Sequence, residues 1–309
     1  MNSIFEKQIT IPHTDRTIPL VEIIGEKDGP AVLITAGIHG GESLGIRAVM
    51  RLIEYVRNEN ICGKLLICPC CNTDAFYLHL PYIVPEDGKN LLRVFPGDPH
   101  GSFSQKIAAF FTEQVFSSVD YYIDIHSGDI PEMLCPHVYY SALGDDKTTE
   151  TSKSMAISTG LRFAVLSQGK NGSIQSAVQQ NIPAILMEMG DSGLWNEDDA
   201  ETYFHHICGV LSHLGVCNSP SIFSPSSHVS ETFGVLAAFD GCWFPAIGPG
   251  DIVERGKRIG EIRDFLGKTL SVVYADFSGI VLYGRKALSV QKGDLLVYCG
   301  RTDSIKSGY

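Results

Sequence analysis

The first residues suited to metal chemistry are His39 and Glu42, three positions apart in the glycine-rich segment 37–42. Positions i and i+3 in the first turn of a helix face the same way, so this imidazole and this carboxylate could hold one ion. The glycines keep bulk away and allow unusual backbone dihedral angles. An H-x-x-E pair alone is a weak motif that occurs by chance. Its setting after the apolar, strand-like run 31–36 raises the expectation of a metal site.

A third candidate ligand, His126, ends another apolar run, residues 121–126. Two histidines and one carboxylate from neighbouring strand ends make a three-ligand site with an open fourth position, the pattern of catalytic rather than structural zinc. Asp124 lies two residues earlier and points to the same face of the strand, so it is a candidate to orient a ligand histidine. A hydrogen-bonding role at the strand edge explains Asp124 equally well.

Glu188 ends a third strand-like run and is followed by a glycine at position 190. A carboxylate beside a metal-bound water can take its proton and pass it to a leaving amine, which makes Glu188 the natural general base. Considered alone, a strand-terminal acid that caps a turn is the simpler interpretation. The metal ligands on neighbouring strand ends favour catalysis instead. Asp191 lies in the same loop and is a weaker candidate.

A long, irregular excursion over residues 72–99 carries a further candidate, Arg93. Loops of this length inside compact domains are usually functional. An arginine between apolar residues in such a loop is suited to bidentate binding of a carboxylate. A surface salt bridge explains the arginine equally well when it is considered alone.

Two other groups of potential ligands are expected to be structural. The cluster Cys68, Cys70 and Cys71 lacks the usual C-x-x-C spacing and ends a strand-like run, so we predict a role in the core or at the strand end. His205 and His206 lie on a predicted helix, and no nearby acid or thiol completes a ligand set with them. We interpret them as surface or packing residues.

These side chains require a frame that brings strand ends together. The apolar run 31–36, a helix-like segment to about residue 57 and the apolar run 63–69 form a βαβ unit. Such apolar strands are typical of parallel sheets covered by helices on both faces, and sites form at their carboxyl edge. We therefore predict an α/β catalytic domain over residues 1–218, with a mostly parallel or mixed sheet flanked by helices. Residues 9–24 are expected to form an opening hairpin or edge strands.

The sequence pattern changes after a predicted linker, rich in Ser and Pro, at residues 218–227. Short strand-like runs with glycine turns follow, and they contain an internal repeat. Residues 237–241 match 275–279, and residues 253–256 match 290–293. The pattern predicts a second domain over 219–309, a small all-β sandwich or barrel with twofold pseudo-symmetry. Its second half resembles lipoyl/biotinyl-type folds, but no convincing modifiable lysine stands at the symmetry turn, so we predict no carrier role.

The composition bounds the function. The 309 residues are 44% hydrophobic and 19% charged, which suffices for a sizeable core and two domains. The net charge of -11 argues against nucleic acid as a partner, and no apolar run approaches the roughly 20 residues of a membrane span. Nine cysteines on irregular spacings, with no visible export signal, favour reduced thiols in a cytoplasmic protein.

Four ordered motifs together resemble the succinylglutamate desuccinylase/aspartoacylase family, part of a wider zinc carboxypeptidase-like clan. They are G-x-H-G-x-E, D-G-K-N-L-x-R-x-F-P-G-D, D-I-H-S-G-D and a late E-x-G. The resemblance covers nearly the whole chain, including the β-rich tail. It implies one Zn²⁺ ion held by three ligands, a general base/acid and an arginine that binds a substrate carboxylate. By this resemblance the metal ligands are His39, Glu42 and His126. Glu188 is the general base/acid, and Arg93 binds the substrate carboxylate.

The chain departs from the family pattern at two positions. The family usually has Asn immediately before the loop arginine, where this chain has Leu92. Many relatives also carry an arginine that helps to polarise the scissile carbonyl, and its place falls near Pro81. No arginine lies between Cys71 and Leu92. Removing one oxyanion-stabilising group commonly costs several kcal/mol. The departures therefore leave three interpretations open: a substrate different from the family's, a substitute stabilising group, or weak turnover.

The expected function is that of a zinc-dependent amidohydrolase, a deacylase acting on a small N-acylated amino acid or related amine. The expected partner is thus a small molecule, neither nucleic acid nor membrane, and the sequence leaves a homo-oligomer open. Two alternatives remain at this point. One is a metallocarboxypeptidase acting on short peptides, and the other is a metal-binding relative with lost or weak turnover.

Overall fold

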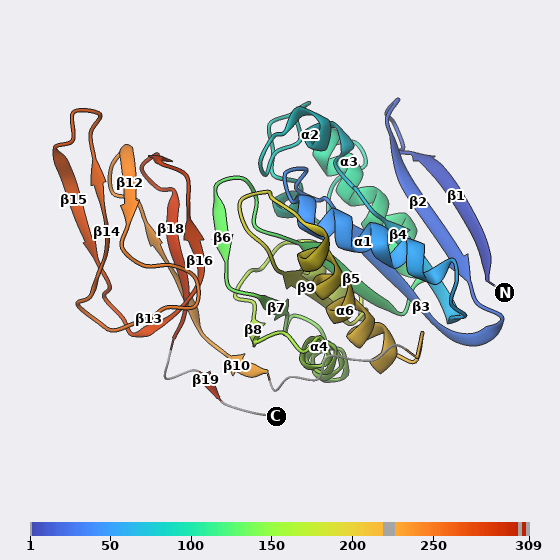
Figure 1. Cartoon of the computed structure of the whole chain (residues 1–309). Coiled ribbons are helices and arrows are strands. Elements are labelled where there is room, and N and C mark those ends of the chain that lie inside the picture. The colour runs from blue at the N-terminus through green and yellow to red at the C-terminus, as the bar shows by residue number, and fades with distance from the viewer. Residues whose placement is uncertain (1, 219–225, 302–304, 307–309) are drawn as a thin grey trace.

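A ten-stranded sheet forms the frame of the molecule within the residues that the computed structural model describes, which are 2–218, 226–301 and 305–306 (Figure 1). Its strand order is β1-β2-β4-β3-β5-β9-β7-β8-β10-β19. The bounds in chain order are β1 Ser3–Thr10, β2 Thr17–Ile24, β3 Lys27–Ala36, β4 Cys62–Cys68, β5 Tyr121–His126, β7 His137–Tyr140, β8 Phe163–Leu166, β9 Ala184–Glu188, β10 Ser227–Val229 and β19 Ile305–Lys306.

The centre of this sheet is parallel and its margins are mixed. Strands β4, β3, β5 and β9 are parallel neighbours, whereas β7 runs antiparallel to β9 and β1–β2 form an antiparallel hairpin at the edge. Because parallel strands end at one edge, the segments that follow β3, β5 and β9 leave the sheet side by side. The predicted mixed, helix-flanked α/β fold and the opening edge hairpin are thereby confirmed.

Helices cover both faces of the sheet, as the apolar strands require. On one face lie α1 (Ser43–Val56), α4 (Asp146–Ser158) and α6 (Glu197–His213), whose apolar residues share a core with Val32 and Ile34. On the other face, α3 (Phe103–Ala109), its continuation η2 (Phe110–Val115) and η3 (Phe116–Ser118), and α5 (Ser173–Val178) pack with Leu33. Alternate residues of β3 thus enter opposite cores.

The long excursion over 72–99 is less irregular than predicted. It contains the short helix α2 (Thr73–Leu78) and the 3₁₀ turn η1 (Leu91–Val94). Asn72 caps the first and Asn90 caps the second, each through its side-chain oxygen. The segment is therefore a built part of the domain that holds Arg93 at a fixed place.

The C-terminal region is a sandwich of two antiparallel sheets (Figure 1). One has the order β11-β18-β16-β13 and the other the order β15-β14-β12-β17. Their bounds are β11 Thr232–Leu236, β12 Gly241–Pro245, β13 Ile252–Val253, β14 Arg258–Arg263, β15 Thr269–Tyr274, β16 Gly279–Arg285, β17 Ser289–Val290 and β18 Leu295–Arg301. Each sheet takes two strands from residues 232–263 and two from 269–301, and the predicted internal repeat stays a prediction.

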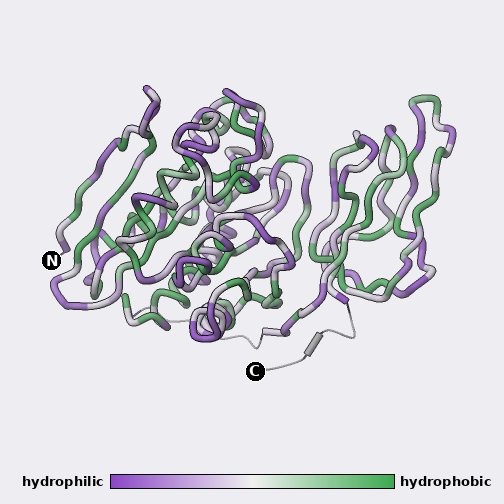
Figure 2. The backbone as a smooth tube through the Cα atoms, turned by 180° about the vertical axis from the view of Figure 1, so that it is seen from behind, coloured by the Kyte–Doolittle hydropathy of each residue, from purple (hydrophilic) through white to green (hydrophobic). Residues whose placement is uncertain are grey.

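The two regions are joined by strands that cross between them. Strand β6 (Glu132–Leu134) pairs with β16 of the sandwich, while β10 and β19 extend the large sheet. The expected division after residue 218 therefore stays a prediction, and most of the predicted linker 218–227 lies outside the described residues. Figure 2 shows hydrophobic stretches along the strands of both regions. None of the described helices has the length and apolarity that crossing a bilayer requires.

Candidate active site

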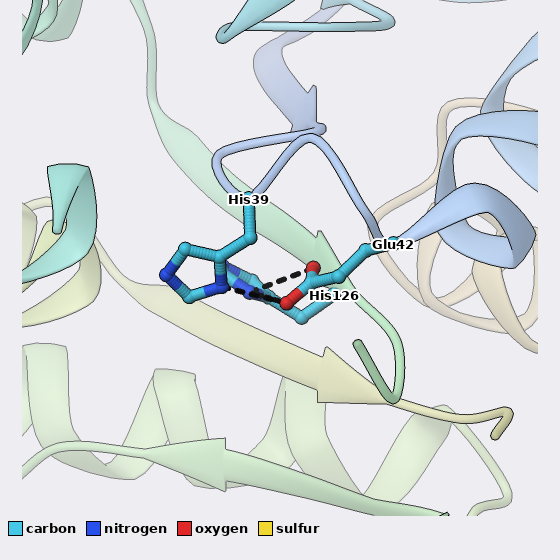
Figure 3. Close-up of side chains that lie close together, drawn as sticks. All are labelled: His39, Glu42 and His126. Carbon is cyan, nitrogen blue, oxygen red and sulfur yellow. Dashed lines mark hydrogen bonds and ion pairs between the residues drawn. The ribbon is translucent and has the colours of Figure 1, made fainter. Parts of the chain in front are cut away.

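Three side chains from the carboxyl edge of the sheet converge on one point. His39 lies in the loop after β3, Glu42 precedes α1, and His126 is the last residue of β5. The Nδ1 atom of His39 is 2.6 Å from Oε1 of Glu42, and Nδ1 of His126 is 3.0 Å from Oε2. Figure 3 shows the carboxylate facing both rings. One ligand atom from each residue lies within 4.8 Å of the others, so the structure brings the three predicted ligands together.

The glycine-rich loop makes this convergence sterically feasible. A Cβ atom at Gly41 would lie 1.9 Å from Oδ1 of Asp129, and one at Gly40 would lie 2.2 Å from the backbone nitrogen of Phe76. Neither position has room for a side chain. The Asp129 side chain and the backbone of α2 therefore pack directly against the loop and fix where His39 and Glu42 point.

The cluster is electrostatically suited to a cation. Burial alone would raise the pKa of Glu42, but the two neighbouring histidines hold it at about 2. Burial alone would lower the pKa of His126, but Glu42 and Asp124 raise it well above its usual range. The carboxylates thus require positive charge beside them, which protons or a metal ion can supply. Two imidazole nitrogens and one carboxylate are a donor set that fits zinc.

Oxygen atoms stand behind both histidines. Oδ2 of Asp124 is 3.2 Å from Nε2 of His126, although the ring nitrogen makes no aligned hydrogen bond. Asp124 is fully buried and accepts hydrogen bonds from Thr35 and Ser173. Oδ1 of Asn90 lies 3.1 Å from Nε2 of His39. Such partners orient metal-binding rings and fix their tautomer. The sequence predicted this role for Asp124 but missed Asn90, although Asn90 stands inside the loop motif.

Glu188 ends β9 beside His126. The two residues are partners in the register of β5 and β9, and Glu188 is also the partner of His137 on β7. Residues in register on neighbouring strands share one face of a sheet, so the three side chains form a row. Burial raises the pKa of Glu188 well above its ordinary value, and the charges of Glu42 and Glu132 raise it further, against the effect of His126. The predicted general base thus lies next to the ligand cluster.

A pocket of about 610 Å³ opens onto this row. His39, Glu42, Glu188 and Arg93 all line it. The sandwich contributes part of its wall through Tyr283 and Arg285 of β16 and Leu295 and Tyr298 of β18. The C-terminal region therefore shapes the site, a role that the sequence did not assign to it.

Two further polar residues of the pocket were missed by sequence reasoning. Glu132 accepts hydrogen bonds from the Tyr82 hydroxyl and the Asp129 backbone, and burial raises its pKa to about 7. His137 is buried, and burial lowers its pKa to about 4. No spacing rule connects these residues with the ligand motif. The bridging strand β6 and the turn into β7 bring them to the pocket.

The remaining candidates lie elsewhere. Asp191 forms an ion pair with Lys286, at 3.3 Å, and is not among the pocket residues. His205 pairs with Glu201, and His206 bonds to the carbonyl of Thr159. Cys68, Cys70 and Cys71 are buried and free, and burial raises the pKa of Cys70 to about 12, as suits packing thiols.

Comparisons with the sequences of known proteins point to one family. Residues 28–214 match the sequence model of the succinylglutamate desuccinylase/aspartoacylase catalytic domain. An N-alpha-acetyl-L-2,4-diaminobutyric acid deacetylase from Halomonas elongata is 28% identical over 293 residues, covering 89% of this chain and 83% of that protein.

Solved structures show the same fold over almost the whole chain. The product-bound ectoine utilization protein EutE (DoeB) from Ruegeria pomeroyi superimposes with a TM-score of 0.86 at 23% identity, covering 97% of this chain and 95% of that one. A succinylglutamate desuccinylase from Silicibacter sp. TM1040 gives 0.86 at 21% identity, covering 99% and 95%. The match to the catalytic-domain model covers more than half of this chain, so the chain belongs to the succinylglutamate desuccinylase/aspartoacylase family.

Proposed function

We propose that the protein is a zinc-dependent amidohydrolase that removes the acyl group from a small N-acylated amino acid or related amine. The observation that carries the proposal is the convergence of His39, Glu42 and His126 beside Glu188 at the head of one pocket. The deacetylase relative supports amide hydrolysis as the reaction, because the name of that protein specifies an N-acetylated amino acid as its substrate.

Each residue of the site has its own proposed role in the reaction. His39, Glu42 and His126 would hold the zinc ion, which supplies Lewis acidity that lowers the pKa of water and polarises the amide carbonyl. Glu188 accepts a proton from the attacking water and then donates it to the departing nitrogen. Asp124 and Asn90 keep the two imidazole rings in place.

Arg93 is the proposed partner of a substrate carboxylate. It lies at the exposed rim of the pocket, and Asn90, which bonds to His39, also caps the turn that carries it. The arginine and the ligand cluster are therefore linked through one side chain. Leu92 lines the pocket at the place of the family's asparagine and offers no hydrogen bond. Arg93 thus binds the anionic group without that help.

The test combines metal analysis with a substrate panel. The protein is loaded with zinc and offered N-acetyl and N-succinyl amino acids, N-acetyl-2,4-diaminobutyrate and dipeptides. We expect one bound zinc and release of a free amine from N-acyl amino acids. Glu188→Gln should keep the zinc and lose about 100-fold or more in kcat, the usual weight of a general base. Glu150→Gln, an exposed acid-to-amide change on α4, should keep both.

Three outcomes would contradict the proposal. Cleavage of dipeptides without cleavage of N-acyl amino acids would identify a carboxypeptidase. A zinc-loaded protein inert on the whole panel would identify a binding protein that has lost turnover, the alternative that Leu92 and the absent loop arginine motivate. Full activity of Glu188→Gln would show that Glu188 is not the general base.

A further inference from the structure

Glu132 is a carboxylate in the pocket wall that the proposed hydrolysis does not use. It lies on β6, the strand that bridges the two regions, and it lines the pocket together with Leu134, two residues further on the same face. Its Oε1 accepts a hydrogen bond of 2.8 Å from the Tyr82 hydroxyl, and its Oε2 one of 2.9 Å from the Asp129 N–H. Both donors are neutral.

No cation neutralises Glu132 within the described part of the chain. Arg285 is its register partner on β16 and also lines the pocket, yet the guanidinium turns away. It lies 3.3 Å from Oδ2 of Asp294 and donates to the carbonyl of Leu295. A partly buried carboxylate with two hydrogen bonds and no counter-charge is costly in an empty pocket. The cost falls when a cationic ligand binds, since the pairing is then charge-assisted.

His137 adds a second acceptor to the same wall. Its Nδ1 lies 2.7 Å from the carbonyl oxygen of Cys135, so Nδ1 carries the proton and Nε2 keeps a free lone pair. That Nε2 atom is buried and has no hydrogen-bond partner in the described residues. His137 lines the pocket next to Glu188, its register partner. A buried acceptor without a donor points to a ligand that supplies one.

We propose that this acceptor wall, Glu132 and His137, binds a protonated amino group of the substrate. The proposal deepens the proposed function and rests on it: the preferred substrate is a diamino acid acylated on one nitrogen. Its amide lies at the ligand cluster, its carboxylate at Arg93, and its free ammonium at Glu132. An ammonium group carries three donors and can serve a carboxylate and an imidazole together. The apolar Leu134 and Leu295 line the same pocket and suit a short alkyl chain.

The test compares two substrates that differ only in charge at the chain end. N-acetyl-2,4-diaminobutyrate ends in an ammonium group, and N-acetylnorvaline carries a methyl group there. The zinc-loaded protein should prefer the ammonium compound in kcat/KM by about 10- to 100-fold, the usual weight of a charge-assisted hydrogen bond. Glu132→Gln, which keeps an acceptor for Tyr82, should reduce that preference to about threefold or less. Asp191→Asn, a matched change outside the pocket, should leave it unchanged.

A binding measurement separates this proposal from the hydrolysis itself. Calorimetric titration with the two deacylated products, 2,4-diaminobutyrate and norvaline, should show the same preference in the unmodified protein and its loss in Glu132→Gln. A protein that hydrolyses nothing but binds diaminobutyrate through Glu132 would overturn the deacylase function and support the ammonium site.

An active enzyme that treats both substrates alike would overturn the ammonium site and leave the deacylase function standing. That comparison needs only the unmodified protein, so a Glu132→Gln variant that fails to fold does not weaken it.

Discussion

The ligand cluster and the acceptor wall face the same pocket but are built in different ways. His39, Glu42 and His126 sit on adjacent parallel strand ends, each oxygen or ring nitrogen close to a complementary group. Glu132 and His137 come from β6 and the start of β7. Among the described residues, the Glu132 carboxylate has no counter-charge and Nε2 of His137 has no hydrogen-bond partner. The first arrangement fits the proposed single ion, whereas the second is the proposed site of an ammonium group. In our proposal, the catalytic chemistry and the substrate selectivity therefore belong to separate parts of one site.

The strongest test of this difference is to remove one of the proposed metal ligands. His126→Ala should lower bound zinc below about a tenth of an equivalent and reduce activity by about 1000-fold or more, because two ligands cannot fix the ion and Glu42 loses its neighbour. Atomic absorption and kcat/KM report the two effects. The matched change His205→Ala, at a histidine that pairs with Glu201 on α6, should leave both values unchanged. Full zinc occupancy in His126→Ala would refute the assigned ligand set.

Acidification should lower the stability of the folded protein through His137 of the acceptor wall. Its pKa is about 4 in the folded protein, against an ordinary value of 6.5, because burial disfavours the charged ring. Between these values the unfolded chain binds the proton and the folded chain does not, so this contribution to stability is lost as the pH falls from about 6.5 to 4. Linkage puts it at roughly 3 kcal/mol. His137→Gln should therefore lose less stability on acidification than the unmodified protein.

Urea unfolding of the metal-free proteins at pH 7 and near pH 4.5 measures that difference. The control is His100→Gln, at an exposed histidine, which should follow the unmodified protein. Equal acid sensitivity of His137→Gln and the parent would show that the ring is not held neutral by burial.

Changing Asp124, which stands behind His126, should reduce zinc binding less than removing a metal ligand does. Asp124→Asn keeps the shape and the hydrogen bonds to Thr35 but removes the charge 3.2 Å from His126. Zinc affinity should fall by about 10- to 100-fold, the usual effect of changing such a partner. Competition with a chelator of known affinity measures it. An unchanged affinity would assign Asp124 to the strand edge alone, the other interpretation that the sequence allowed.

The same contrast explains what the sequence could predict. The ligand cluster was predictable because parallel strands end at one edge, so local patterns at three strand ends imply a meeting point. Glu188 and Asp124 followed from those patterns. Glu132 did not, because its place depends on the pairing of a three-residue strand, β6, with β16 about 150 residues later. His137 did not, because its place beside Glu188 depends on the antiparallel pairing of β7 with β9. The return of β10 and β19 to the large sheet escaped prediction for the same reason.

The smallest expected effect concerns the sandwich side of the wall. Arg285 lines the pocket and is held by Asp294 and the carbonyl of Leu295, so it braces the β16–β18 face instead of neutralising Glu132. Arg285→Gln should raise KM by about fivefold while kcat and zinc content stay within about twofold, because a loosened wall weakens substrate binding without touching the ligands. Arg258→Gln, at a more exposed arginine of the sandwich, is the control. If Arg285→Gln instead lowered kcat with KM unchanged, the sandwich would act in the chemical step, and the separation between ligand cluster and wall would not hold.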